Sequence, residues 1–266
     1  MALRTLNREP MPARLTRFAV LGLSVAVVLT MFLEPATISD APRENHLSLL
    51  GLLVPEVLWT EPLVYAFGAV AFVAGVAMWM LTGRATIGSV LAVAGLGLLV
   101  SFQVENDLYA QHQLFQPFTV LAVLSAATAM QRGNLRLPTW VWTAVAVAVG
   151  WGYTLAGWEK IMTSGLAWGD GTALRVWLVQ FAADDALADW LVATPWAARV
   201  CLSATLAVET FAVLGLGFRL TRVPFAFVLL IIHLAAEVMM GLHFFGNEFI
   251  MVVLMLTVLI PRLSDA

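Results

Sequence analysis

The sequence predicts an all-α fold, a polytopic bundle of membrane helices with about eight spans and an interfacial amphipathic segment near residues 166–192. The first observation is composition. Of the 266 residues 61% are hydrophobic and only 12% are charged, whereas a soluble domain is about half apolar and a quarter charged. A water-soluble protein could not hide that much apolar surface. Soluble enzymes, nucleic-acid-binding proteins and disordered regulators are therefore excluded.

The second observation is that apolar residues fall into runs near the length that a bilayer needs, roughly 17–25 residues. Short polar breaks separate these runs, and no repeat or linker marks a boundary, so we expect one transmembrane domain over residues 1–266. The candidate spans are 18–33, 62–82, 85–104, 113–130, 139–157, 197–217, 223–245 and a short one at 249–260.

The third observation is the distribution of basic residues, which favours the cytoplasmic side of a membrane. With the N-terminus inside, ten of the 14 basic residues lie in inner segments and four in outer ones, namely Arg43, Lys160, Arg175 and Arg199. We therefore expect a bacterial inner-membrane protein with both termini cytoplasmic. The first run also fits a secretory signal cleaved near Ala41, but it is longer than the 7–15 residues usual for a signal core, which favours a retained span.

The stretch 158–196 differs from the spans because it mixes five tryptophans with acidic residues. Trp is enriched at membrane–water boundaries, and residues 172–181 have the pattern of an amphipathic helix lying in the interface. The stretch is either an anchoring loop or a lid over an outward-facing pocket.

Lys160 is the only lysine among the 14 basic residues. Only lysine, not arginine, can lose its proton and act as a base. Tyr153 shares a helix face with it, and Gly157 permits close approach of another helix or a ligand. The alternatives are a lysine that snorkels at a helix end or one that pairs with Glu159.

Ionisable residues within apolar runs are costly and suggest function. His233 and Glu237 are four residues apart on one face, and Glu209 lies within another span. A structural pair between His233 and either glutamate is one interpretation and a role in chemistry is the other. His112 opens the fourth span and His243 closes the seventh, which places both near the outer surface with Lys160. Because the ligand spacing is poor, we expect no metal.

The runs YTLAGWEK, from Tyr153 to Lys160, and WGDGTAL, from Trp168 to Leu174, resemble the central motif of the vitamin K-dependent gamma-carboxylase-like family, built on the horizontally transferred transmembrane domain. Glu209 resembles that family's acidic helix. His233, followed by Gly241 and Phe244, resembles its His-Leu and Gly-x-x-Phe helix, and His112 matches a position that is often Asn or His. The resemblance covers nearly the whole chain.

The resemblance implies that Lys160 is a catalytic base that takes a proton from reduced vitamin K or another quinol, with His112 and His233 assisting. Oxygen then adds, and the resulting alkoxide base prepares a glutamate side chain for carbon dioxide. Supporting positions would be Tyr153, Gly157, Trp158, Trp168, Asp170, Glu209, Glu237 and His243.

Two features depart from the family's carboxylase. The large extramembrane domain that holds the peptide substrate has no counterpart in these 266 residues, and Glu159 stands where a basic residue fits better. The protein or peptide substrate is therefore left unknown. The expected partners are membrane lipid and a small apolar quinol, with no nucleic acid. The alternatives are a non-catalytic quinone- or lipid-binding or partner subunit, or a proton-coupled transporter that uses His233 and Glu237.

Overall fold

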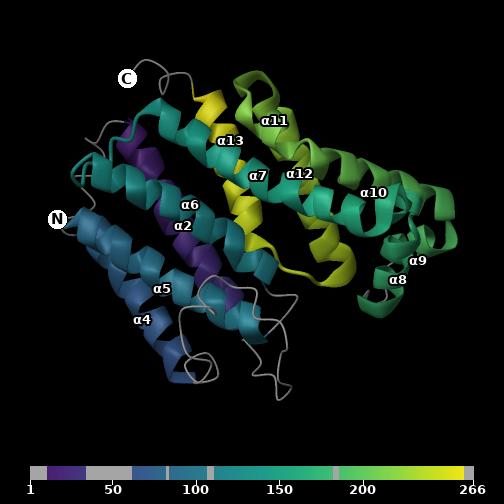
Figure 1. Ribbon diagram of the computed structural model, residues 1–266, viewed down its shortest axis with the longest axis horizontal. Coiled ribbons are helices and arrows are strands. Elements are labelled where there is room, and N and C mark those ends of the chain that lie inside the picture. Colours follow the sequence, from purple (N-terminus) through teal and green to yellow (C-terminus); the bar gives the residue numbers. More distant parts are fainter. Residues whose placement is uncertain (1–10, 34–61, 82–83, 107–110, 182–185, 261–266) are drawn as a thin grey trace. The chain divides into compact units, whose positions relative to one another are not determined.

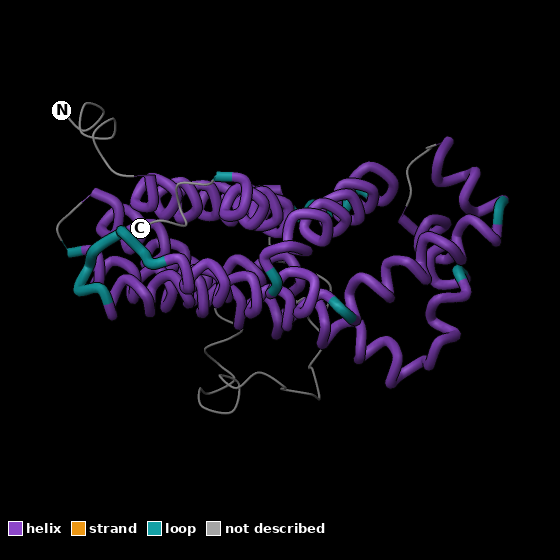
Figure 2. The backbone as a smooth tube through the Cα atoms, turned by 90° about the horizontal axis from the view of Figure 1, so that it is seen from above, coloured by secondary structure: helices purple, strands orange, loops and turns teal. Residues whose placement is uncertain are grey.

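The computed structural model describes residues 11–33, 62–81, 84–106, 111–181 and 186–260, and the regular elements in these ranges are all helices (Figure 2). The predicted all-α class is confirmed for this part of the chain. Contacts between Cα atoms divide the chain into two compact units, one within residues 1–141 and the other over residues 142–261. The alternative of a signal cleavage site near Ala41 concerns residues outside the described ranges.

The first unit contains four long helices: α2 (Met11–Leu33), α4 (Pro62–Leu81), α5 (Ala85–Asn106) and α6 (Gln111–Met130). Helices α4 and α5 run side by side in Figure 1 and approach closely. A Cβ added to Gly75 would lie 2.2 Å from the Ala92 nitrogen, and one added to Gly88 would lie 2.3 Å from the Trp79 nitrogen. Only glycine fits such contacts, which are typical of helix packing in membranes.

Polar side chains tie the helices of the first unit together inside this apolar packing. The Ser125 hydroxyl of α6 donates to the Ser89 hydroxyl of α5 at 2.9 Å, and the Arg17 guanidinium of α2 donates to the Met80 carbonyl at 2.6 Å. Because Met80 lies in the last turn of α4, Arg17 satisfies a carbonyl that has no partner within the helix.

The second unit begins within the first turn of α7 (Thr139–Ser164). The sequence predicted a span ending at residue 157, but the helix continues to Ser164. Gly165 then adopts a φ of +62°, the left-handed conformation that commonly ends helices. Lys160 is therefore one turn inside the helix rather than at its end.

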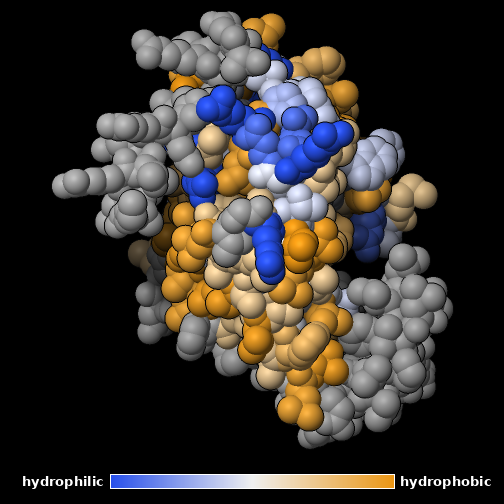
Figure 3. Space-filling view, turned by 90° about the vertical axis from the view of Figure 1, so that its left-hand side faces the viewer, coloured by the Kyte–Doolittle hydropathy of each residue, from blue (hydrophilic) through white to orange (hydrophobic). Residues whose placement is uncertain are grey.

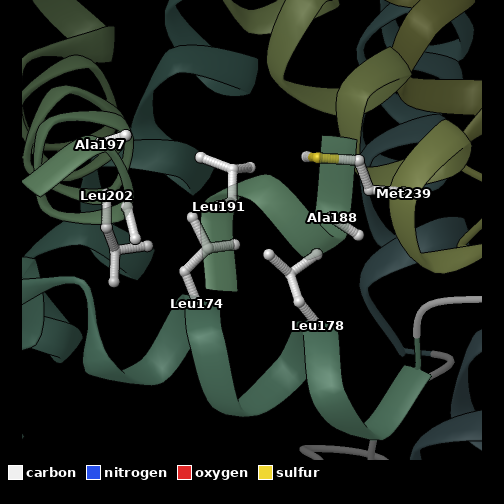
Figure 4. Close-up of a cluster of buried hydrophobic side chains, with 8 residues drawn as sticks. Leu174, Leu178, Ala188, Leu191, Ala197, Leu202 and Met239 are labelled. Atoms are coloured by element: carbon white, nitrogen blue, oxygen red, sulfur yellow. The ribbon is translucent and has the colours of Figure 1, made fainter. Parts of the chain in front are cut away.

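Three short helices follow α7: η1 (Gly165–Asp170), α8 (Thr172–Phe181) and α9 (Ala186–Ala193). The predicted amphipathic helix over residues 172–181 is confirmed as α8. Its apolar face joins a cluster with α9, α10 and the end of α12 (Figure 4), formed by Leu174, Leu178, Ala188, Leu191, Ala197, Ala198, Leu202 and Met239. The short helices thus cover the ends of two longer ones.

The predicted span 197–217 is interrupted, so a single helix over that range was wrong. Helix α10 (Pro195–Thr210) ends before Phe211, and α11 (Ala212–Gly217) follows. The Val213 backbone N–H donates to the Thr154 hydroxyl of α7 at 3.0 Å. This side chain replaces a helical acceptor, which lets the helix break within an apolar segment.

Helices α12 (Arg219–Met240) and α13 (Phe245–Leu259) complete the second unit. The sequence placed this break at residues 246–248, but it lies at residues 241–244. Gly241, with a φ of +66°, ends α12, so His243 belongs to the connecting loop and not to the span. At the other end of α12, the buried Arg222 donates from Nε to the Leu216 carbonyl at 2.8 Å and so caps α11.

Among the described residues, four helices are long and apolar enough to cross a membrane: α2, α4, α5 and α12. A fifth results if α9 and α10, which meet at a bend of 101°, are one broken span. Many large apolar side chains lie on the surface, and the face in Figure 3 is largely hydrophobic with hydrophilic atoms gathered toward one end. These features are consistent with an integral membrane protein.

Candidate functional site

Helix α7 positions the first side chains of the site by packing closely against α10. A Cβ added to Gly157 would lie 2.7 Å from the Thr210 backbone nitrogen. The sequence left open whether Gly157 admits a helix or a ligand, and the structure shows a helix. This close approach brings Lys160, one turn further along α7, beside Glu209.

Lys160 and Glu209 form a partly buried ion pair. The Lys160 ammonium donates to Glu209 Oε2 at 2.5 Å, with the two side chains 27% and 13% exposed. The Trp168 ring of η1 lies over the ammonium, 4.6 Å from nitrogen to ring centroid, a cation–π contact that strengthens where water is excluded. Lys160 is therefore held between α7, α10 and η1, and its ion-pair partner is Glu209 rather than Glu159.

Tyr153 and His233 form a second polar pair, and both side chains are buried. The Tyr153 hydroxyl lies 3.1 Å from His233 Nε2, a hydrogen bond between α7 and α12. The Phe244 ring also packs against the imidazole, with 5.0 Å between the ring centroids. Nδ1 of His233 lies toward the backbone of Leu229, one turn earlier, without reaching hydrogen-bond geometry.

One interpretation of the sequence paired His233 with Glu209 or Glu237, but in the structure the hydrogen-bond partner of His233 is Tyr153. Glu237 instead accepts a hydrogen bond from His243 Nδ1 at 2.9 Å. The i+4 spacing does place Glu237 one turn beyond His233, but Gly241 ends the helix and lets the loop return His243 to Glu237. His233 meanwhile faces α7, which the sequence could not show.

Glu248, in the first turn of α13 and before the apolar stretch 249–260, completes the group. It was not among the predicted site residues. Burial, followed by the charge of Glu237, raises the pKa of Glu248 to about 7. The signal in the sequence was a carboxylate directly preceding an apolar stretch.

We call these seven residues the polar cluster: Tyr153, Lys160, Glu209, His233, Glu237, His243 and Glu248. Their charges act on one another. The carboxylates of Glu209 and Glu248 both interact electrostatically with the Tyr153 hydroxyl. The Lys160 ammonium interacts electrostatically with the His233 imidazole. Helices α7, α10, α12 and α13, with the loop that carries His243, thus bring seven ionisable or hydroxyl side chains to one region of the second unit.

The other predicted residues lie elsewhere or serve the fold. Trp158 is 51% exposed. Asp170 is exposed, and the Thr172 N–H that donates to its Oδ1 at 2.7 Å lowers the pKa of its carboxyl, so Asp170 fixes the turn into α8. His112 lies in the first turn of α6, but its side chain is outside the described residues, and its role stays a prediction.

The polar cluster can hold and move protons. It offers an amine, three carboxylates, two imidazoles and a phenol, several of them buried where an unpaired charge is costly. Among the described residues, no group of three or more His, Cys, Asp or Glu side chains has an arrangement that could hold a metal ion.

Comparison of the chain with protein-family models, with curated proteins and with solved structures finds no match. The resemblance to the gamma-carboxylase-like family therefore stays a prediction based on the quoted residues.

Proposed function

We propose that the second unit removes a proton from a small apolar acid of the hydroquinone class, with Lys160 as the base. The observation that carries this proposal is the placement of the only lysine. Lys160 is paired with Glu209 at 2.5 Å under the Trp168 ring, beside a buried tyrosine–histidine pair. A lysine that only snorkelled would extend to the surface instead.

The ion pair accounts for how the amine becomes free. In the resting pair one proton is shared between Lys160 and Glu209. When an apolar ligand displaces water, separated charges become more costly than a neutral pair. The proton then moves from Nζ to the Glu209 carboxylate, and the amine lone pair can take the proton of a ligand hydroxyl.

The other residues bind and orient the ligand. The rings of Trp168 and Phe244 offer faces on which an aromatic ring can stack. Tyr153 and His233 can each donate or accept a hydrogen bond. When bound, the hydroquinone supplies a hydroxyl whose anion reacts with oxygen. Reduced vitamin K is one member of this class, and coupling to carbon dioxide uptake by a second substrate is part of the proposal through the family resemblance.

We further propose that the protein crosses a bacterial inner membrane about eight times, with both termini cytoplasmic and the polar cluster toward the outer side. Helix α7 has 26 residues and is about 39 Å long at 1.5 Å per residue, enough to span. Reporters inserted near Gly133 and fused after Arg262 should both read as cytoplasmic. A periplasmic signal from either reporter would contradict this topology.

The test uses the full chain in lipid nanodiscs with a reduced naphthoquinone as the probe. Oxygen-dependent consumption of the hydroquinone should fall by about 10²–10⁴-fold in Lys160→Arg, because arginine keeps the charge but cannot act as a base. Glu159→Gln, which changes an exposed neighbour, is the matched control and should retain activity.

Binding is measured in parallel through quenching of tryptophan fluorescence by the quinone. Lys160→Arg should still bind, because Trp168 and the ion pair are kept. Unchanged turnover in Lys160→Arg would refute the role as base. Binding without any turnover by the unmodified protein would instead favour the non-catalytic quinone-binding alternative.

A further inference from the structure

We call η1, α8 and α9 the covering helices. We propose that their exposed surface is seated in the lipid–water interface of the membrane, so that an apolar ligand reaches the Lys160–Glu209 pair from lipid rather than from water. The partner of this surface is the bilayer itself. The proposal deepens the proposed function and rests on it for the kind of ligand, but the seating of the helices and the access to Lys160 are measured with no hydroquinone present.

Helix α8 is apolar on the face that packs within the protein and also on the face that does not. Leu174 and Leu178 point into the cluster shared with α9, α10 and α12 (Figure 4). Val176, Val179 and Phe181 are exposed, Val179 by 71%. A helix that is hydrophobic all round is typical of a buried position or of a membrane. No described residue buries the second face, so lipid is the covering that its composition fits.

The charged side chains of the covering helices fit a boundary position. Arg175 is the one charged residue of α8, and its Nε donates to the Val192 carbonyl of α9 at 2.9 Å, which ties α8 to α9. Asp170 and Asp189 are exposed and lie in η1 and α9, outside α8. A largely apolar surface with a few exposed carboxylates at its margin is suited to the interface rather than to the hydrocarbon core.

Tryptophans mark the same boundary. Trp158, Trp177, Trp190 and Trp196 are all exposed, and Trp190 packs edge-on against Trp196 with 6.3 Å between ring centroids. Tryptophan is enriched where a membrane meets water, because its ring is apolar and its single N–H is a hydrogen-bond donor. Four exposed indoles on and beside the covering helices therefore favour the bilayer interface as their surroundings.

This surface also continues an exposed apolar stripe along α7. Five exposed side chains follow one another at intervals of three or four residues and so share one helix face, namely Val147, Trp151, Leu155, Trp158 and Met162. Leu166 of η1, 78% exposed, comes four residues after the last of them. A stripe along most of a helix that is long enough to span fits lipid better than the local patch of a protein contact.

Two aromatic rings connect this surface to the Lys160–Glu209 pair. The Trp168 ring lies over the Lys160 ammonium at 4.6 Å and packs edge-on against Trp177 of α8, with 5.9 Å between ring centroids. Trp177 is exposed, and the Lys160 side chain is itself 27% exposed. A molecule dissolved in the interface therefore meets aromatic rings beside the amine, whereas a charged molecule in water is separated from it by apolar surface.

The seating of α8 is tested with nitroxide spin labels on the full chain in lipid nanodiscs. Cys201→Ser removes the only cysteine, and Val179→Cys then places a label on the exposed face of α8. Gln131→Cys, in an exposed turn, is the matched control. Molecular oxygen concentrates in lipid and a charged nickel complex stays in water. The ratio of oxygen to nickel accessibility should be severalfold higher at position 179 than at position 131.

Two results would overturn the seating in lipid. Nickel accessibility at position 179 equal to that at position 131 would place this face of α8 in water. Low accessibility to both reagents would show that protein covers the face, and dipolar broadening between labels would then identify a second copy of the chain.

Access to Lys160 is tested with two amine reagents that differ in charge, phenyl isothiocyanate and its 4-sulfonate. Because Lys160 is the only lysine, mass spectrometry of its fragment separates it from the α-amino group, and Lys160→Arg gives the background. Gln131→Lys adds an amine in an exposed turn of the same molecule. In nanodiscs the ratio of apolar to sulfonated labelling should be severalfold higher at position 160 than at position 131.

Equal ratios at the two positions would show access from water, and no modification of Lys160 by the apolar reagent would show no access from lipid. Either result would overturn the proposed route. Neither experiment includes a hydroquinone or requires turnover, so failure of the proposed function would leave both results unchanged.

Discussion

Replacing Glu209 by glutamine tests the ion pair at the centre of the site. The substitution keeps the shape of the side chain but leaves the Lys160 ammonium without the carboxylate that lies 2.5 Å away. Exposed pairs contribute roughly 0.2–1 kcal/mol, and breaking a buried pair costs roughly 3–5 kcal/mol. With side chains 13% and 27% exposed, this pair lies between these cases, so we expect a loss of about 2 kcal/mol in the free energy of unfolding.

A loss of that size corresponds to an apparent melting temperature about 4–8 °C lower for a chain of this length. The measurement is thermal unfolding in nanodiscs, followed by circular dichroism. Glu159→Gln carries the same chemical change on an exposed neighbour and should melt within about 1 °C of the unmodified protein, as surface substitutions usually do. Lys160→Arg keeps the charge and should also stay close to it.

The double variant Lys160→Gln with Glu209→Gln separates pairing from packing. If the cost arises from an unpaired buried ammonium, removing that charge should recover part of the loss, so the two single effects will not add. A Glu209→Gln protein as stable as Glu159→Gln, or a double variant with the full sum of both losses, would refute the inference that this ion pair stabilises the fold.

Three further predictions use the same thermal assay. His233→Ala should remain folded with a loss of about 1–3 kcal/mol, because it leaves the Tyr153 hydroxyl unpaired rather than a carboxylate; failure to fold would assign His233 to packing alone. Gly157→Ala should cost about 1–3 kcal/mol through overpacking against α10, whereas Gly217→Ala, whose Cβ would meet Val147 at 3.4 Å, should be tolerated. Because the pKa of Glu248 is raised from 4.5 to about 7, the folded state binds more protons than the unfolded state between these values, and stability should fall as pH rises through that window. Glu248→Gln should flatten this dependence, and an unchanged slope would contradict it.

The failures of sequence reasoning about the site have a common physical origin. The i+4 spacing of His233 and Glu237 was read correctly as one helix face, but that spacing says nothing about which neighbouring helix the face meets. Tyr153 was likewise placed on the face of Lys160, yet its bond to His233 spans 80 positions in the chain. Partners within a helix follow from its period, whereas partners between helices depend on packing.

The ends of the helices likewise divide into those that the local sequence predicts and those that depend on packing. The amphipathic pattern alone defined α8 at residues 172–181, since the period of apolar residues and the flanking turn residues are local. The break at Phe211 has no such local signal, because it depends on the Thr154 hydroxyl of α7 accepting the Val213 N–H. An apolar run predicts a helix, but a long-range acceptor decided where this one is interrupted.

Composition and periodicity by themselves determined that this is a helical protein suited to a membrane, and the single lysine directed attention to Lys160. These properties are sums over residues or patterns along one helix, so they need no knowledge of the fold. Only the tertiary structure decided that Lys160 pairs with Glu209, that His233 pairs with Tyr153, and that Glu248 joins Glu237 and His243. Each of these pairings depends on close helix approach and on where a helix ends, at Gly157 and Gly241, and such distances are set by the packing of the whole second unit.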